Sequence, residues 1–105
     1  MVNNKKLLFN SKSIFTMRLL ITFTSLINTL SIINNETTSD DIQAIVFAVG
    51  KKLEYENLRE WFKGLYETVL GQSEGPRMGS FIKLYGIEST IKLLENVILG
   101  KLVKE

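Results

Sequence analysis

The glycines and the single proline of this 105-residue chain are concentrated in residues 70–87, LGQSEGPRMGSFIKLYGI, which hold four of its seven glycines. Pro76 suits the first position of a helix, because the N–H that proline lacks would have no partner there. Gly86 suits the end of the same helix, because glycine tolerates the left-handed conformation that often terminates helices. The stretch therefore predicts a short helix over residues 76–85, fixed as a corner between two longer helices.

Apolar residues elsewhere in the chain recur at spacings of three and four, which is typical of helices with one buried face. No segment shows the alternation of apolar and polar residues that predicts a strand. The pattern predicts helices over residues 13–33, 39–53, 54–70, 76–85 and 87–99, after a loosely ordered lead-in at residues 1–12. The predicted fold class is all-α, a compact bundle of about five short helices in a single domain, residues 1–105.

Several helix ends carry local signals. Residues 34–41, NNETTSDD, form the clearest polar break in the chain, and Thr38 or Ser39 is expected to cap the helix that follows. Gly71 is expected to end the helix over residues 54–70, and Gly100 the last helix. These signals divide the chain into short helices. No heptad repeat continues past a single helix, so a regular coiled coil is not expected.

Residues 13–33 are the most hydrophobic run, and a membrane-spanning helix or a secretory signal is the alternative to a buried helix. Arg18 lies inside this run, polar residues interrupt it at helical spacing, and no small-residue cleavage site follows. We therefore predict an amphipathic core helix. Arg18 lies on its polar face, where it either reaches RNA or keeps that face hydrated.

Composition narrows the possible chemistry. The chain has no cysteine, which excludes disulfides and thiolate metal sites, and no histidine, which excludes the usual catalytic triads and zinc sites. The acidic residues near Lys63 have the spacing of a solvated, ion-paired helix face rather than of a catalytic pair. The glycines of residues 71–79 follow no strand and lack Gly-Lys-Ser/Thr, so they do not form a nucleotide-binding loop. We predict no catalytic and no metal-binding residue.

A series of short motifs occupies residues 61–94. They are Trp61-Phe62, Leu65-Tyr66, Leu70-Gly71, Gly75-Pro76-Arg77, Gly79-Ser80-Phe81, Leu84-Tyr85-Gly86 and the closing Ile91 to Leu94. Together they resemble the C-terminal end of the class I lysyl-tRNA synthetases, whose architecture the glutamyl-tRNA synthetases share. Glutamyl enzymes usually lack the glycine-proline-arginine followed by leucine-tyrosine-glycine. The lysyl family is therefore favoured, and the equivalent domain of a glutamyl-tRNA synthetase is the alternative.

The resemblance implies a helical anticodon-binding domain. A whole enzyme of this class carries an ATP-binding histidine motif and a lysine-serine-lysine loop on a Rossmann domain, and neither is present in this chain. The fragment is therefore expected to be non-catalytic and without a cofactor, while ATP with Mg²⁺ belongs to the parent lysine–tRNA ligase. The expected partners are tRNA, through the anticodon loop of tRNA(Lys), and the catalytic domain of the same parent chain. The expected location is the cytoplasm, without a membrane.

Anticodon bases are bound by stacking and by hydrogen bonds to their edges, while cations contact the phosphates. The resulting RNA-binding candidates are Arg77, Gln72, Ser73, Ser80, Lys83 and Arg18. Arg77 is the first choice, and its alternative role is a clamp that holds the corner through a carbonyl or carboxylate. Trp61 is assigned to the core, while Arg59 and Lys63 are interpreted as solvated charges. A protein-interaction module whose apolar first helix docks on a partner is the alternative function.

Overall fold

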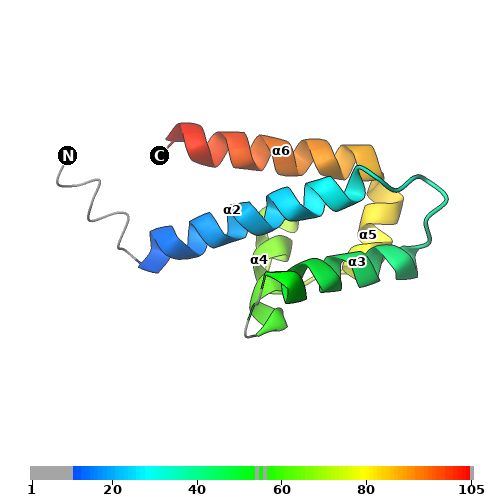
Figure 1. The fold of residues 1–105 in the computed structure, drawn as a ribbon, viewed down its shortest axis with the longest axis horizontal. Helices are drawn as coiled ribbons and strands as arrows, with labels where there is room; N and C mark the ends of the chain where they lie inside the picture. Colours follow the sequence, from blue (N-terminus) through cyan, green and yellow to red (C-terminus); the bar gives the residue numbers. More distant parts are fainter. Residues whose placement is uncertain (1–10, 54, 56, 105) are drawn as a thin grey trace.

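The computed structural model of the chain describes residues 11–53, 55 and 57–104, and the regular structure of that part is entirely helical (Figure 1). The helices are α2 (Ser11–Leu30), α3 (Ser39–Lys52), α4 (Leu58–Leu70), α5 (Met78–Tyr85) and α6 (Ile87–Lys104). The predicted all-α class is confirmed.

The helices pack together into one bundle (Figure 1). The two long helices α2 and α6 pack side by side in opposite directions, and α3 runs back along α2. The short α5 packs closely on α3, and α4 crosses the other helices. Residues more than 30 positions apart in sequence, such as Gln43 and Gly79 with a separation of 36, are therefore brought together at the junction of α3 and α5.

Several predicted helix ends are confirmed. Thr38 caps α3, and its hydroxyl oxygen accepts a hydrogen bond from the backbone N–H of Asp41 at 3.1 Å. Gly71 ends α4 in the left-handed conformation, with φ of 75°. Gly86 separates α5 from α6 with φ of 110°, another value that side chains resist. Local sequence signals therefore determine where these helices stop or start.

Other helix ends differ from the prediction. The helix expected from residue 54 begins at Leu58, because the side chain of Asn57 accepts a hydrogen bond from the N–H of Arg59 and caps it there. The first helix begins at Ser11, two residues before the predicted start, and the rest of the predicted lead-in, residues 1–10, lies outside the described residues. This helix ends at Leu30, and residues 31–33 lie in the turn and loop that follow.

The corner helix also begins later than predicted. Pro76 lies in the turn before α5, which begins at Met78 with Arg77 at the capping position, so its assignment as the first helical residue was wrong. Gly100 does not end the last helix, because α6 continues to Lys104. A glycine inside a helix costs about 1 kcal/mol relative to alanine, which the rest of the helix can offset.

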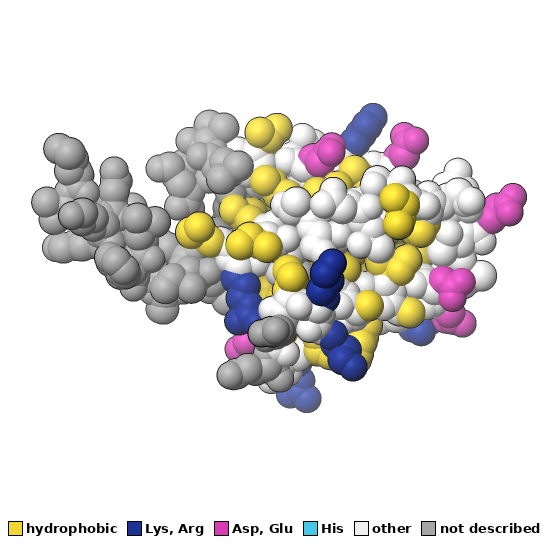
Figure 2. Space-filling view, in the orientation of Figure 1, with side chains coloured by type: hydrophobic (Ala, Val, Ile, Leu, Met, Phe, Trp, Pro, Cys, Tyr) yellow, Lys and Arg dark blue, Asp and Glu magenta, His cyan; other side chains and the backbone are white. Residues whose placement is uncertain are grey.

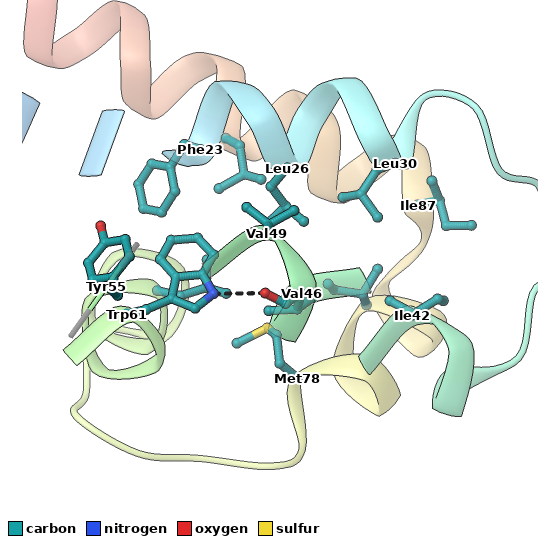
Figure 3. Close-up of a cluster of buried hydrophobic side chains, with 13 residues drawn as sticks. Phe23, Leu26, Leu30, Ile42, Val46, Val49, Tyr55, Trp61, Met78 and Ile87 are labelled. Carbon is teal, nitrogen blue, oxygen red and sulfur yellow. Dashed lines mark hydrogen bonds between the residues drawn. The ribbon is translucent and has the colours of Figure 1, made fainter. Parts of the chain in front are cut away.

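The hydrophobic core is centred on Trp61 of α4, which is fully buried (Figure 3). Its ring packs against those of Phe23 and Tyr55, with centroids 5.9 and 5.8 Å away, and its Nε1 donates a hydrogen bond to the carbonyl of Val46 at 2.9 Å. Each described helix contributes to this core. The other buried apolar residues are Leu26, Leu30, Ile42, Val49, Leu65, Met78, Ile82, Ile87 and Leu94.

Candidate nucleic-acid interface

The corner, residues 71–86, is attached to α3 at Gly79. The N–H of Gly79 donates a hydrogen bond to the side-chain oxygen of Gln43 at 2.7 Å. A Cβ at this position would lie closer than 3.0 Å to the carbonyl oxygen of Ser39 and to the backbone nitrogen of Gln43. Because backbone atoms cannot move aside as side chains do, only glycine allows α5 to approach α3 so closely.

Two of the predicted RNA-binding cations also contact this junction. Arg77 forms an ion pair with Asp40 at 2.5 Å, in the first turn of α3. Lys83 donates hydrogen bonds to the backbone carbonyl of Asn35 and, at 2.8 Å, to that of Thr37. The carboxylate clamp considered for Arg77 is therefore present. Arg77 connects the start of α5 to the first turn of α3, and Lys83 connects α5 to the segment that leads into α3.

The ion pair of Arg77 and Asp40 is expected to contribute little to stability, because the two side chains are 51% and 80% exposed. A double-mutant cycle with Arg77→Ala and Asp40→Ala should give a coupling energy of about 0.2–1 kcal/mol in urea unfolding. The coupling should shrink as salt is raised from low ionic strength. A coupling that stays undiminished at high salt would contradict this expectation.

The three polar candidates, Gln72, Ser73 and Ser80, are exposed. Between described residues, no hydrogen bond of the structure involves their side chains. The turn that carries Gln72 and Ser73 is anchored by Tyr66, whose hydroxyl donates to the carbonyl of Pro76 at 2.6 Å. Burial raises the pKa of this hydroxyl above its usual value of 10.0, although the backbone N–H of Met78 opposes the shift. The hydroxyl therefore remains a donor at neutral pH.

Arg18 is separate from the other five candidates. Its guanidinium lies 4.3 Å from the centroid of the Tyr55 ring and donates a hydrogen bond to the carbonyl of Leu53 at 3.2 Å. It borders a shallow apolar pocket with Met17, Ile21 and Leu53. This pocket is near the start of α2, at the opposite end of the bundle from α5 (Figure 1).

A groove lies along the exposed side of α4, beside the turn of residues 71–77. Its volume is about 480 Å³. Its lining, which defines the α4 groove below, consists of Arg59, Phe62, Lys63, Tyr66, Ser73 and Glu74. Of these residues only Ser73 was predicted as a contact. The sequence pattern that could have predicted this groove is the spacing of residues 59, 62, 63 and 66. This spacing puts two cations and two aromatic rings on one helix face.

Surface charge is unevenly distributed (Figure 2). Acidic side chains mark the end of the bundle formed by the loop between α2 and α3 and the start of α3, which carries Asp40 and Asp41. Many of the visible basic side chains lie nearer the other end of α3, whose last turn carries Lys51 and Lys52. On the face shown in Figure 2, a polyanion is therefore favoured more toward the junction of α3 and α4 than at the acidic loop end.

Metal-binding clusters and membrane-spanning helices are both absent from the described residues. No group of three or more acidic side chains there is arranged to hold a metal ion. None of the helices in that part of the chain is both long enough and apolar enough to span a bilayer.

Comparison with known proteins finds lysine–tRNA ligases that are similar to this chain. The chain is 56% identical over 61 residues to a lysine–tRNA ligase of Rickettsia felis, an alignment that covers 58% of this chain and 12% of the ligase. The chain is similar to a segment of lysine–tRNA ligases. The ligase of Rickettsia prowazekii is 52% identical over 65 residues, and one of Rickettsia bellii is 56% identical over 57 residues.

The extent of this similarity is limited. The matched segments cover 62% and 54% of this chain for the latter two ligases, and the chain spans only 11–12% of the length of these curated relatives. No protein-family model matches the chain, and no solved structure is significantly similar to it. The similarity therefore supports the interpretation of this chain as a fragment of an aminoacyl-tRNA synthetase.

Proposed function

We propose that this chain is the C-terminal anticodon-binding part of a class I lysine–tRNA ligase. Its task is to position tRNA(Lys) for ATP-dependent aminoacylation in the cytoplasm by a catalytic domain on other residues of the parent enzyme. The observation that carries the proposal is the 56% identity over 61 residues with a lysine–tRNA ligase. The motifs of residues 61–94 support the class and the domain, since they resemble the end of class I lysyl enzymes.

The residues of this chain suit binding rather than chemistry. It has no histidine or cysteine, so neither ATP activation by a histidine motif nor covalent catalysis by a thiolate is available to it. We assign no catalytic residue and no cofactor to this chain, and we place ATP, with Mg²⁺, on the parent enzyme. The partners are the anticodon loop of tRNA(Lys) and the catalytic domain.

The proposed contacts follow from the corner. Gln72, Ser73 and Ser80 present amide and hydroxyl groups to solvent, which can hydrogen-bond to base edges or to the RNA backbone. Arg77 and Lys83 keep the corner on α3 and retain further N–H donors for phosphate, because guanidinium has five donors and ammonium three. Arg18 extends the proposed contacts toward the start of α2.

The experiment is a titration of the full chain with a fluorescently labelled anticodon stem-loop of tRNA(Lys), followed by anisotropy at fixed salt. We expect binding that weakens when the anticodon bases are changed. Equal affinity for every loop, rising steeply as salt is lowered, would indicate a nonspecific electrostatic surface. The absence of binding to any stem-loop would overturn the proposal.

Arg77→Ala is the informative variant, and Asp40→Asn is its matched control. Either substitution breaks the ion pair at the corner, but only Arg77→Ala removes a cation that could contact RNA. If Arg77 contacts RNA, Arg77→Ala should weaken binding, while Asp40→Asn should leave it unchanged or strengthen it by removing a negative charge. Equal weakening by both variants would show that Arg77 acts only through the fold of the corner.

A further inference from the structure

The α4 groove combines the kinds of side chain with which proteins bind single-stranded RNA. Arg59 and Lys63 are exposed and lie four residues apart, and Phe62 and Tyr66 have the same spacing between them. Positions three and four apart are neighbours on a helix surface, so cations and rings alternate along one face of α4. Proteins that bind unpaired nucleotides use this combination of a stacking ring and a nearby cation.

The two aromatic side chains of the groove are held in place. The hydroxyl of Tyr66 is bonded to the carbonyl of Pro76 at 2.6 Å, which ties the helix to the turn on the other side of the groove. The ring of Phe62 packs against that of Phe47 on α3, with centroids 6.2 Å apart and planes inclined by 50°. Both rings are half-buried, so binding would order few additional side-chain torsions.

The size and charge of the groove also suit one nucleotide. Its volume of about 480 Å³ is within the range of sites that enclose small organic ligands. Two cations and the carboxylate of Glu74 give the lining a net charge of +1, which favours a phosphate only moderately. The hydroxyl of Ser73 adds a hydrogen-bonding group from the turn.

We propose that the α4 groove binds one unstacked nucleotide of the anticodon loop. Its base stacks on Phe62 and Tyr66, and its phosphate lies against Arg59 and Lys63. This inference rests on the proposed function and places the contact on the α4 side of the turn. Ser73 belongs both to this groove and to the proposed corner contacts.

The test measures binding of the full chain to the labelled stem-loop at several salt concentrations. Lys63→Ala should weaken binding and lower the slope of log affinity against log salt by about one, the value for one lost phosphate contact. Lys92→Ala is the matched control, because Lys92 is also exposed but lies on α6, outside the groove. It should bind as the unchanged chain does, with the same slope.

Two further variants test the ring and the carboxylate. Phe62→Leu keeps an apolar side chain but removes the stacking plane, and should weaken binding by about 5-fold or more with an unchanged salt slope. Glu74→Gln should strengthen binding, because it removes the negative charge of the groove. Circular dichroism melting of each variant separates loss of binding from loss of folding. Lys63→Ala and Glu74→Gln change exposed side chains, so they remain informative if Phe62→Leu is unstable.

The possible outcomes separate a failure of the groove assignment from a failure of the proposed function. If the unchanged chain binds the stem-loop and Lys63→Ala and Glu74→Gln bind as well as Lys92→Ala does, the groove is not the contact surface. The proposed function would then stand, with the corner as its site. If the unchanged chain binds no stem-loop, the proposed function fails, and the assignment of the groove fails with it.

Discussion

Replacement of Trp61 by alanine is expected to lower the free energy of unfolding by about 3–5 kcal/mol, the range for truncating a large aromatic residue in a core. The side chain is fully buried, and it packs against Phe23 of α2 and Tyr55. Its removal leaves a cavity where α2, α3 and α4 meet, and it also removes a hydrogen bond to the carbonyl of Val46. Urea unfolding followed by far-ultraviolet circular dichroism measures the change.

Phe47→Ala is the matched control for this prediction. Phe47 is also aromatic and also contacts α4, but it is 44% exposed. Its truncation should cost much less than that of Trp61, because the surface it buries is smaller and solvent fills the space left behind. Similar losses of stability for the two variants would mean that Trp61 is not the centre of the core.

Gly79→Ala is expected to lower the free energy of unfolding by about 3 kcal/mol, the upper end of the usual cost of overpacking. The added methyl group would overlap the carbonyl oxygen of Ser39 and the backbone of Gln43, neither of which can rotate away. The helix α5 must then move off α3, which lengthens the hydrogen bond between Gly79 and Gln43 and separates Arg77 from Asp40. Thermal and urea unfolding measure this effect.

Replacement of Gly100 by alanine should raise the free energy of unfolding, whereas the same change at Gly79 lowers it. A Cβ at Gly100 meets no described atom within 4 Å, and the residue lies inside α6. Alanine there should therefore stabilise the chain by about 0.5–1 kcal/mol, because it favours the helix over the unfolded chain. If Gly79→Ala also stabilised the chain, the close contact of α5 and α3 would be wrong.

Gly79→Ala also bears on function. The corner holds Gln72, Ser73 and Ser80 in position only while α5 stays on α3, because the turn of residues 71–77 ends at α5. A variant that folds but releases α5 should lose affinity for the anticodon stem-loop without losing any proposed contact residue. Binding measured on Gly79→Ala below its melting temperature therefore tests whether the corner must be rigid.

Much of the fold could be predicted from local patterns. The three- and four-residue spacing of apolar side chains predicts the all-α class and places Trp61 in the core, because a helix with one apolar face must bury that face. Thr38 and Gly71 set helix ends through hydrogen bonding and conformational freedom that act within a few residues. The start of α4 was missed, although the signal at Asn57 is equally local.

The candidate site was predicted less well. The roles of Arg77 and Lys83 at the corner depend on Asp40 and on the carbonyl of Thr37, which are 37 and 46 residues away in sequence. No periodicity or motif indicates such a partner. The α4 groove was likewise missed, since Arg59 and Lys63 resemble ordinary solvated charges until the turn that carries Ser73 closes beside them.

The sequence by itself determined the helices, most of their ends, the buried face of each, and the similarity to part of lysine–tRNA ligases, because these properties depend on residues near one another in the chain. Only the tertiary structure decided which charged side chains hold the corner on α3 and which polar side chains remain exposed. That division depends on how α5 packs against α3, and it is the contact between the two backbones at Gly79 that sets their distance. The same packing leaves α4 with a face of cations and rings beside an exposed turn.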